Sequence, residues 1–121
     1  MDKPLKIVQR WARTISTRNV DKMTNFYSEK AILLATFDPF LQGKKEIRNY
    51  FVDFLNKEGL RCEITENVNF IDRMSEYATC SGLYTFTFEE RGIDVEVDAR
   101  YTYVVYKGQI ITHHSSIEPI E

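Results

Sequence analysis

The stretch ARYTYVVYKGQIITHHSS, residues 99–116, decides the fold class of this chain. Ala99, Tyr101, Tyr103 and Val105 fall on every second position, which is the period of a β-strand that buries one face. Lys107-Gly108 then separates this run from a second apolar run, as a hairpin turn does. The stretch therefore predicts two antiparallel strands joined by a tight turn.

The same alternation extends back from this hairpin to Leu60. The apolar positions fall into three sets: Cys62, Ile64, Val68 and Phe70; then Cys80, Gly82, Tyr84, Phe86 and Phe88; then Ile93, Val95 and Val97, which lead into the quoted stretch. Short polar segments, DRMSE and EERG, separate the sets. This pattern predicts four long strands in an antiparallel meander.

The chain before Leu60 has helical periodicity instead. Apolar residues recur at helical spacing in three places: Leu5, Val8, Trp11, Ala12 and Ile15; Val20, Met23, Phe26 and Tyr27; Ile47, Tyr50, Phe51, Phe54 and Leu55. Asn19 and Gly43 are expected as N-caps, and Gly59 as the residue after the third helix. The apolar run AILLATFDPF predicts a strand that ends in a turn at Asp38-Pro39.

Helices followed by strands are typical of an α+β protein. We predict one domain over residues 1–121, with three N-terminal helices packed on a strongly curved, mostly antiparallel sheet. Leu83, Val104 and Ile110 interrupt the polar positions of the strands, so both faces of the sheet carry apolar surface. Three helices can cover only one face, and the other is expected to meet a second copy in a homodimer or higher oligomer.

Composition excludes several classes of function. The chain has 16 basic and 18 acidic residues of mixed order, so no nucleic-acid or anionic membrane surface is predicted. It lacks an apolar run long enough for a signal peptide or a membrane span, and a cytoplasmic protein is expected. Cys62 and Cys80 stand outside any metal motif and are expected as free thiols. No cofactor motif is present, and no cofactor or metal is predicted.

The order of predicted elements resembles the nuclear transport factor 2-like cone, a superfamily that includes SnoaL-like polyketide cyclases and ketosteroid isomerases. Three segments carry the resemblance: ATFDPFLQGKKEIRNYF, SGLYTFTFEERG and ARYTYVVYKGQIITHHSS. The last two are similar to the stand-alone bacterial branch of the calcium/calmodulin-dependent protein kinase II association domain. The superfamily contains enzymes, binding proteins and assembly domains, so the fold alone does not assign a function.

The resemblance to the association domain implies a pocket arginine at Arg100, which would bind an anionic group of a ligand. The alternative is an exposed Arg100 paired with Asp98 or Glu96. A two-residue turn at Lys107-Gly108 would place His113 on the face of Arg100. A type I turn with Gly108 in a left-handed bulge would place His114 and Thr112 there, and we favour it because Lys107 is a poor residue for positive φ. His114 would then act as an acid, a base or an anion ligand, or else as a neutral histidine of the sheet.

Asp38 lies in a context similar to that of the proton-transferring aspartate of ketosteroid isomerases. A general base at this position would abstract a proton next to a carbonyl, with His114 as its partner. The alternative is a plain turn aspartate. Steroid isomerisation itself is not expected, because no second carboxyl group is predicted to point into the cone.

Aromatic side chains are expected to line the cone: Trp11, Tyr27, Phe37, Tyr50, Phe54 and Tyr84. They would either contact a ligand or fill a core that has no ligand. We therefore predict a homo-oligomerising domain that binds a small, part-apolar molecule with an anionic or carboxylate group. The alternative is an isomerase or cyclase-like enzyme that uses Asp38 and His114.

Overall fold

The computed structural model describes residues 3–36 and 40–119. Within them, the helices are α1 (Lys3–Ile15), α2 (Val20–Asn25) and α3 (Lys44–Phe54), and the strands are β1 (Tyr27–Leu34), β2 (Leu41–Gln42), β3 (Glu58–Asp72), β4 (Tyr77–Glu90), β5 (Ile93–Tyr106) and β6 (Gln109–Ile117). The strands form one sheet in the order β2-β1-β6-β5-β4-β3. Only the β1–β6 pair is parallel among these described strands.

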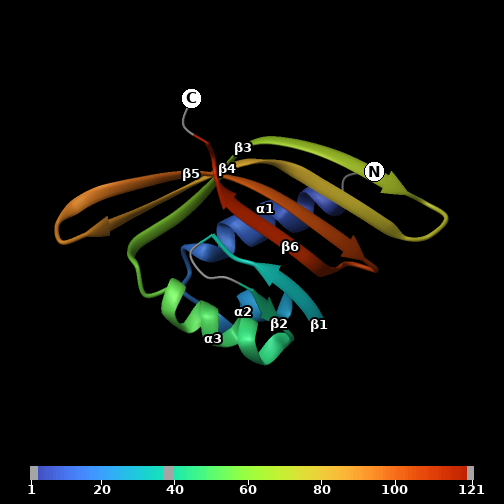
Figure 1. Cartoon of the computed structure of the whole chain (residues 1–121), viewed down its shortest axis with the longest axis horizontal. Coiled ribbons are helices and arrows are strands. Elements are labelled where there is room, and N and C mark those ends of the chain that lie inside the picture. Colours follow the sequence, from blue (N-terminus) through green and yellow to red (C-terminus); the bar gives the residue numbers. More distant parts are fainter. Residues whose placement is uncertain (1–2, 37–39, 120–121) are drawn as a thin grey trace.

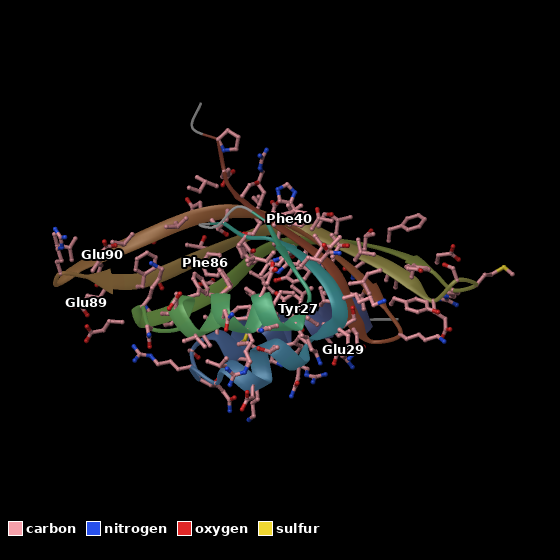
Figure 2. The ribbon with its side chains drawn as sticks, turned by 60° about the horizontal axis from the view of Figure 1, so that its bottom comes forward. Tyr27, Glu29, Phe40, Phe86, Glu89 and Glu90 are labelled. Carbon is pink, nitrogen blue, oxygen red and sulfur yellow. The ribbon has the colours of Figure 1, made fainter. Side chains whose placement is uncertain are left out.

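The helices lie on one side of the curved sheet (Figure 1). In the turned view of Figure 2, the sheet lies above the helices. The buried apolar side chains of α1 and α3 meet those of the strands in one core that includes Val8, Ile15, Ile47 and Phe51. This architecture confirms the predicted α+β class, with helices packed on a curved, mostly antiparallel sheet.

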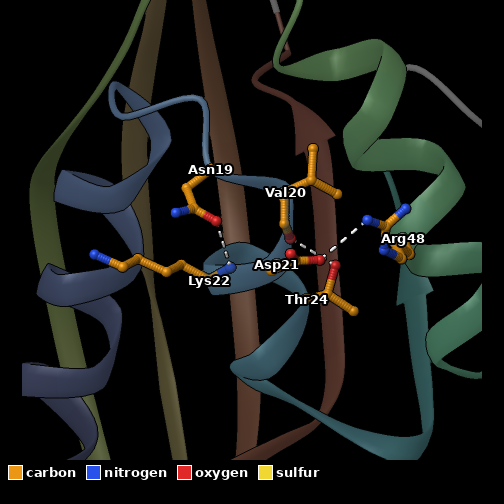
Figure 3. Close-up of polar contacts among 6 residues, drawn as sticks. All are labelled: Asn19, Val20, Asp21, Lys22, Thr24 and Arg48. Atoms are coloured by element: carbon orange, nitrogen blue, oxygen red, sulfur yellow. Dashed lines mark hydrogen bonds and ion pairs between the residues drawn. The ribbon is translucent and has the colours of Figure 1, made fainter.

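The helix boundaries follow local chemistry. Asn19 caps α2, and its side-chain oxygen accepts a hydrogen bond from the backbone N–H of Lys22 at 3.0 Å (Figure 3), which confirms the predicted cap. Gly43 is the N-cap of α3, with a φ of 87° that favours glycine. The carboxylate of Glu46 accepts from the backbone N–H of Gln42 at 3.0 Å, so it satisfies a donor just before the helix.

Three sequence-based boundaries are wrong. Tyr27 does not extend α2 but begins β1, because the backbone there pairs with β6 and Phe26 accepts a hydrogen bond from Ile110 N–H at 2.8 Å. Gly59 does not end α3, whose C-cap is Leu55; it lies inside β3 with a φ of 65°. The short strand β2 was not predicted, since two residues carry no periodicity.

Gly82 on β4 sets the close approach of β3. A Cβ atom at this position would lie 2.0 Å from the carbonyl oxygen of Glu66, where the β3–β4 register shifts. The hydroxyl of Tyr101 occupies the space that a side chain would take, and it lies 3.0 Å from Glu66 O and 2.6 Å from Asn67 Oδ1. The bulge and the glycine together allow the sheet to curve around the helices.

In the part of the chain that is described, no helix has the length and apolar character required to cross a membrane.

Candidate functional site

The interior of the cone holds a cavity of only about 10 Å³. That volume is at the lower limit for one water molecule. Its lining comes from α1, α3, the strands β1, β4 and β6, and the segment after β1: Trp11, Tyr27, Leu33, Ala35, Thr36, Tyr50, Phe51, Phe54, Tyr84, Phe86, His113 and Ser115. This described lining contains no Asp, Glu, Lys or Arg. His113 is its one residue that could take up a positive charge. The described interior is therefore nearly filled by rings and hydroxyl groups.

A chain of hydrogen bonds runs through this interior. Trp11 Nε1 lies 3.0 Å from the hydroxyl of Tyr27, and the same hydroxyl lies 2.8 Å from Nδ1 of His113. On the other side of the imidazole, Nε2 lies 3.1 Å from the hydroxyl of Tyr84. All four side chains are buried, so each of these contacts satisfies a polar group that has no access to water.

The direction of this chain follows from the donors available. An indole N–H can only donate, so the oxygen of Tyr27 accepts from Trp11. Nδ1 of His113 is then the acceptor that the described surroundings offer for the phenolic proton of Tyr27, and in that role it carries a free lone pair. The remaining nitrogen, Nε2, holds the proton and donates it to the oxygen of Tyr84. The network thus assigns His113 to the neutral Nε2–H tautomer.

Burial keeps His113 neutral. Desolvation, with a smaller contribution from the neighbouring His114, lowers the pKa of His113 from 6.5 to about 3. Burial also raises the pKa of Tyr27 and of Tyr84 well above the ordinary value of a phenol. A hydrogen bond with Trp11 partly offsets the rise for Tyr27, and one with Ser115 partly offsets the rise for Tyr84. The interior polar groups are uncharged at neutral pH and can exchange hydrogen bonds but cannot neutralise an anion.

The ring of Tyr103 supports the imidazole from one side. The two rings stack with centroids 4.0 Å apart and an angle of 17°, while Trp11 meets His113 edge-on at 5.3 Å. The hydroxyl of Tyr103 is buried and has no hydrogen-bond partner among the described residues. Tyr103 therefore contributes packing, whereas Tyr27 and Tyr84 contribute hydrogen bonds.

The mouth of the interior lies between α3 and the end of β1. The hydroxyls of Thr36 and Ser115 are hydrogen-bonded there. The rings of Tyr50 and Phe54 on α3 stack at 5.3 Å and line the same space. The volume of about 10 Å³ leaves no room beside His113 for a molecule larger than water in this arrangement of the side chains.

Five of the predicted lining residues are brought together at this cavity: Trp11, Tyr27, Tyr50, Phe54 and Tyr84. Whether they contact a ligand stays a prediction. Phe37 and Asp38 lie outside the described residues.

The expected inward position of Arg100, Thr112 and His114 is wrong. Arg100 and His114 are exposed and lie with Thr112 on the outer face of the sheet, away from the helices. His113 and Ser115 are the residues of β6 that point inward. A pairing of Asp38 with His114 inside the cone is therefore not supported by the position of His114.

The register of the β5–β6 hairpin explains this error. Lys107 and Gly108 form a two-residue turn with φ values of 49° and 81°, both positive, as in a type I′ turn. A bulge then shifts the pairing between Val104 and Val105, so that Arg100 faces Ser116 and Thr102 faces His114. The expected pairs of Arg100 with His114 or Ser115 do not occur. Arg100, Thr112 and His114 do share one face, but it is the outer one.

A signal for this orientation exists in the sequence. Arg100 alternates with Ala99, Tyr101 and Tyr103, which are all buried against the helices. The positions between buried residues of a strand must point outward. This alternation fixes the exposure of Arg100 without any knowledge of the turn.

The outer face itself has two distinct halves. Its apolar half contains Ile32, Leu34, Val68, Phe70, Leu83 and Val104, and among them Val68 and Phe70 are 73% and 70% exposed. Hydroxyl side chains fill the gaps, and Ser81 and Thr102 are hydrogen-bonded across strands at 3.0 Å. The acidic half, towards the β4–β5 turn, contains Glu63, Glu89, Asp94, Glu96 and Asp98. No described helix covers either half.

No described group of three or more His, Cys, Asp or Glu side chains could hold a metal ion. Cys62 and Cys80 are free, and burial is the main cause that raises the pKa of both thiols.

Comparison with known proteins places this fold. The calcium/calmodulin-dependent protein kinase II association domain matches residues 3–119. A solved structure from Xanthomonas campestris, named for the same domain, is 31% identical, covers 94% of this chain and 84% of its own, and has a TM-score of 0.85.

Two more distant structures share the fold. A Streptomyces avermitilis protein, named as a dehydratase of the nuclear transport factor 2-like family, is 11% identical over 98% of this chain and 96% of its own, with a TM-score of 0.87. A Xanthomonas campestris protein named as a polyketide cyclase is 12% identical over 97% and 91%, with a TM-score of 0.68. A search of curated protein sequences gave no match.

The family match spans residues 3–119, and the Xanthomonas structure is similar to this chain in both sequence and fold. The chain belongs to the calcium/calmodulin-dependent protein kinase II association domain family, within the nuclear transport factor 2-like fold.

Proposed function

We propose that this domain dimerises through the apolar half of its outer sheet face. The observation that carries the proposal is the exposure of Val68 and Phe70 beside Leu83 and Val104, on a face that no described helix covers. Exposed apolar patches of this kind mark interaction sites. Membership of an association-domain family supports self-association as the purpose of the patch.

A second copy fits this face better than an unrelated partner. A two-fold contact brings the same patch from both copies together, so apolar residues meet apolar residues. The acidic half lies towards the other end of the strands, and it can remain outside such a contact. Arg100 and His114, which border the apolar half, would then lie at or near the interface and not in a pocket.

The test is a charge placed in the patch. Val68→Glu should shift the protein from dimer to monomer in light scattering and raise the dissociation constant at least about a hundredfold, because each copy would then bury an unpaired carboxylate in the apolar contact. Val52→Glu is a matched control, since Val52 is 41% exposed on α3, away from the sheet face. A dimer that is unchanged by Val68→Glu, or a wild-type monomer at micromolar concentration, would refute the proposal.

We further propose that the interior binds a small, part-apolar molecule that carries a neutral hydrogen-bonding group. The support is the uncharged network of Tyr27, His113 and Tyr84 beside the stacked rings of Tyr50 and Phe54. An anionic or carboxylate ligand was expected from an inward Arg100. With Arg100 outside, a phenol or alcohol suits the interior better than a carboxylate, because no described cation lines the cavity.

Trp11 provides the readout for this second proposal, since it is the single tryptophan and lines the cavity. Phenol should alter its fluorescence at lower concentration than benzoate does, and Phe54→Ala should strengthen phenol binding by opening space. Val52→Ala on the exposed face of the same helix is the control. Tighter binding of benzoate, abolished by Arg100→Gln, would favour the anionic ligand and refute this view.

The enzymatic alternative rests on Asp38 and on the names of distant relatives, whose likeness extends to the fold alone. It predicts turnover of an enolisable ketone that Asp38→Asn abolishes while the circular dichroism spectrum is preserved. A ketone panel without Asp38-dependent turnover would exclude it.

A further inference from the structure

Charge is unevenly distributed along this chain. Residues 1–30 carry seven Lys or Arg against three Asp or Glu, whereas the remaining residues carry nine against fifteen. The two parts therefore have net charges of about +4 and −6, in a chain whose net charge is −2. The positive part forms α1 and α2, and the negative part forms most of the sheet.

A basic groove lies between α1 and α2. It has a volume of about 480 Å³ and is lined by Arg10, Arg13, Thr14, Thr17, Lys22, Asn25 and Phe26. No acidic side chain belongs to this described lining. The guanidinium of Arg10 lies 5.6 Å from the centroid of the Phe26 ring, so the groove combines positive charge with an apolar floor.

The cations of the groove form no described ion pair, although Arg10 also lines a neighbouring hollow that contains Asp72 and Glu76. The described ion pairs involve Lys44, Arg48 and Lys107, and none involves Arg10, Arg13 or Lys22. The nearest acidic residue of α2, Asp21, is already paired with Arg48 at 3.0 Å. Figure 3 shows Lys22 extending away from that pair.

The acidic counterpart is the end of the β4–β5 hairpin, which we call the acidic tip: Glu89, Glu90, Asp94 and Glu96. All four side chains are exposed. The hairpin projects beyond the helices in Figure 1, and Figure 2 shows Glu89 and Glu90 at the far end of the sheet. Arg91 in the turn is the cation of this segment, and Ile93 beside it is 67% exposed.

We propose that the acidic tip of one copy docks in the basic groove of another copy. The carboxylates of the tip match Arg10, Arg13 and Lys22 in sign, and Ile93 matches the apolar floor at Phe26. The inference rests on the proposed self-association but uses different surfaces, because the groove lies on the helical side and the dimer patch on the outer sheet face. A tip-to-groove contact joins unlike surfaces, so it extends a dimer to a larger assembly.

Electrostatics make the contact sensitive to salt. Contacts between exposed charges are screened over about 10 Å at about 0.1 M ionic strength and over about 3 Å at about 1 M. The assembly should therefore be larger than a dimer at low salt and reduce to the dimer at high salt. The dimer itself, formed by apolar residues, should persist.

Charge reversal tests the proposal directly. Variant A carries Arg10→Glu and Arg13→Glu, and variant B carries Glu89→Lys and Asp94→Lys, two residues paired across the hairpin. Each variant alone should stop at the dimer in light scattering at low salt, with the tip-to-groove contact weakened at least about tenfold. An equimolar mixture of A and B should restore the larger assembly, because each then offers the charge that the other needs.

Controls separate the possible outcomes. Lys45→Glu with Asp53→Lys reverses two exposed charges on α3 and should leave assembly unchanged, and circular dichroism verifies the fold of every variant. A wild-type dimer that never grows, or variants A and B that assemble normally or fail to rescue each other, would overturn this inference while leaving the sheet-face dimer intact. Loss of phosphate binding in variant A without any change in assembly would identify the groove as an anion site and would also overturn it. A monomeric wild type would refute the sheet-face dimer instead.

Discussion

The hydroxyl of Tyr27 gives the sharpest test of the interior network. Tyr27→Phe removes one oxygen and leaves two buried groups unpaired, the indole N–H of Trp11 and Nδ1 of His113. An unsatisfied buried donor or acceptor costs about 1–3 kcal/mol, so the substitution should lower the free energy of unfolding by about 2–6 kcal/mol. Only one atom changes, so packing is nearly conserved.

Tyr103→Phe is the matched control. It removes the same atom from a ring that is equally buried and that stacks on the same imidazole, but its hydroxyl has no described partner. Its loss should change the free energy of unfolding by less than about 1 kcal/mol and can stabilise the protein, because a desolvated hydroxyl is no longer buried. The difference between the two variants therefore isolates the hydrogen bonds.

Equilibrium unfolding in urea, followed by far-UV circular dichroism at one fixed protein concentration, measures both values. A fixed concentration is needed because self-association adds to the apparent stability. Equal losses in the two variants would refute the network. A ¹⁵N spectrum in which His113 carries its proton on Nδ1 would refute the assigned donor order, because Tyr27 would then accept from both Trp11 and His113.

Other predictions follow from single positions. His113 has a pKa of about 3 when folded and an ordinary value of 6.5 when unfolded, so the unfolded chain binds the extra proton. The contribution of neutral His113 to the free energy of unfolding is therefore fully present above pH 6.5. It falls by about 1.4 kcal/mol per pH unit between pH 6.5 and pH 3. Urea unfolding of His113→Gln at several pH values should not show this fall. Gly82→Ala should lower the free energy of unfolding by about 1–3 kcal/mol, because its Cβ meets Glu66 O, whereas Thr87→Ala on the same strand serves as control. Lys107→Asn should raise the midpoint of urea unfolding slightly, since Asn tolerates the φ of 49°, and Lys107→Gln controls for the lost charge.

The fold could be predicted from the sequence because its signals are local. Trp11, Ala12 and Ile15 recur at helical spacing, and their side chains are buried on one face of α1. The oxygen of Asn19 caps α2 without help from distant residues. In contrast, Tyr27 fits the helical period, but its backbone is held in β1 by pairing with β6, a contact across more than 80 positions that periodicity does not reveal.

The two faces of the sheet were only partly predictable. Leu83 and Val104 interrupt the polar positions, and this indicates that the outer face is not simply solvated. The division into an apolar and an acidic half depends on how strands align, since Val68 meets Ser81 and Glu89 meets Asp94 only in the observed register. Strand alignment is a property of the whole sheet and cannot be read from one strand.

The choice between the two histidines depends on a single inserted residue. With the two-residue turn at Lys107-Gly108 and no bulge, Thr102 would face His113, and His114 would point inward. The shift between Val104 and Val105 moves Thr102 opposite His114 and turns His113 inward. A one-residue slip exchanges the two faces of a strand. The bulge therefore determines which imidazole joins Tyr27 and Tyr84, and it leaves the other exposed beside Arg100 on the face that we propose for the dimer.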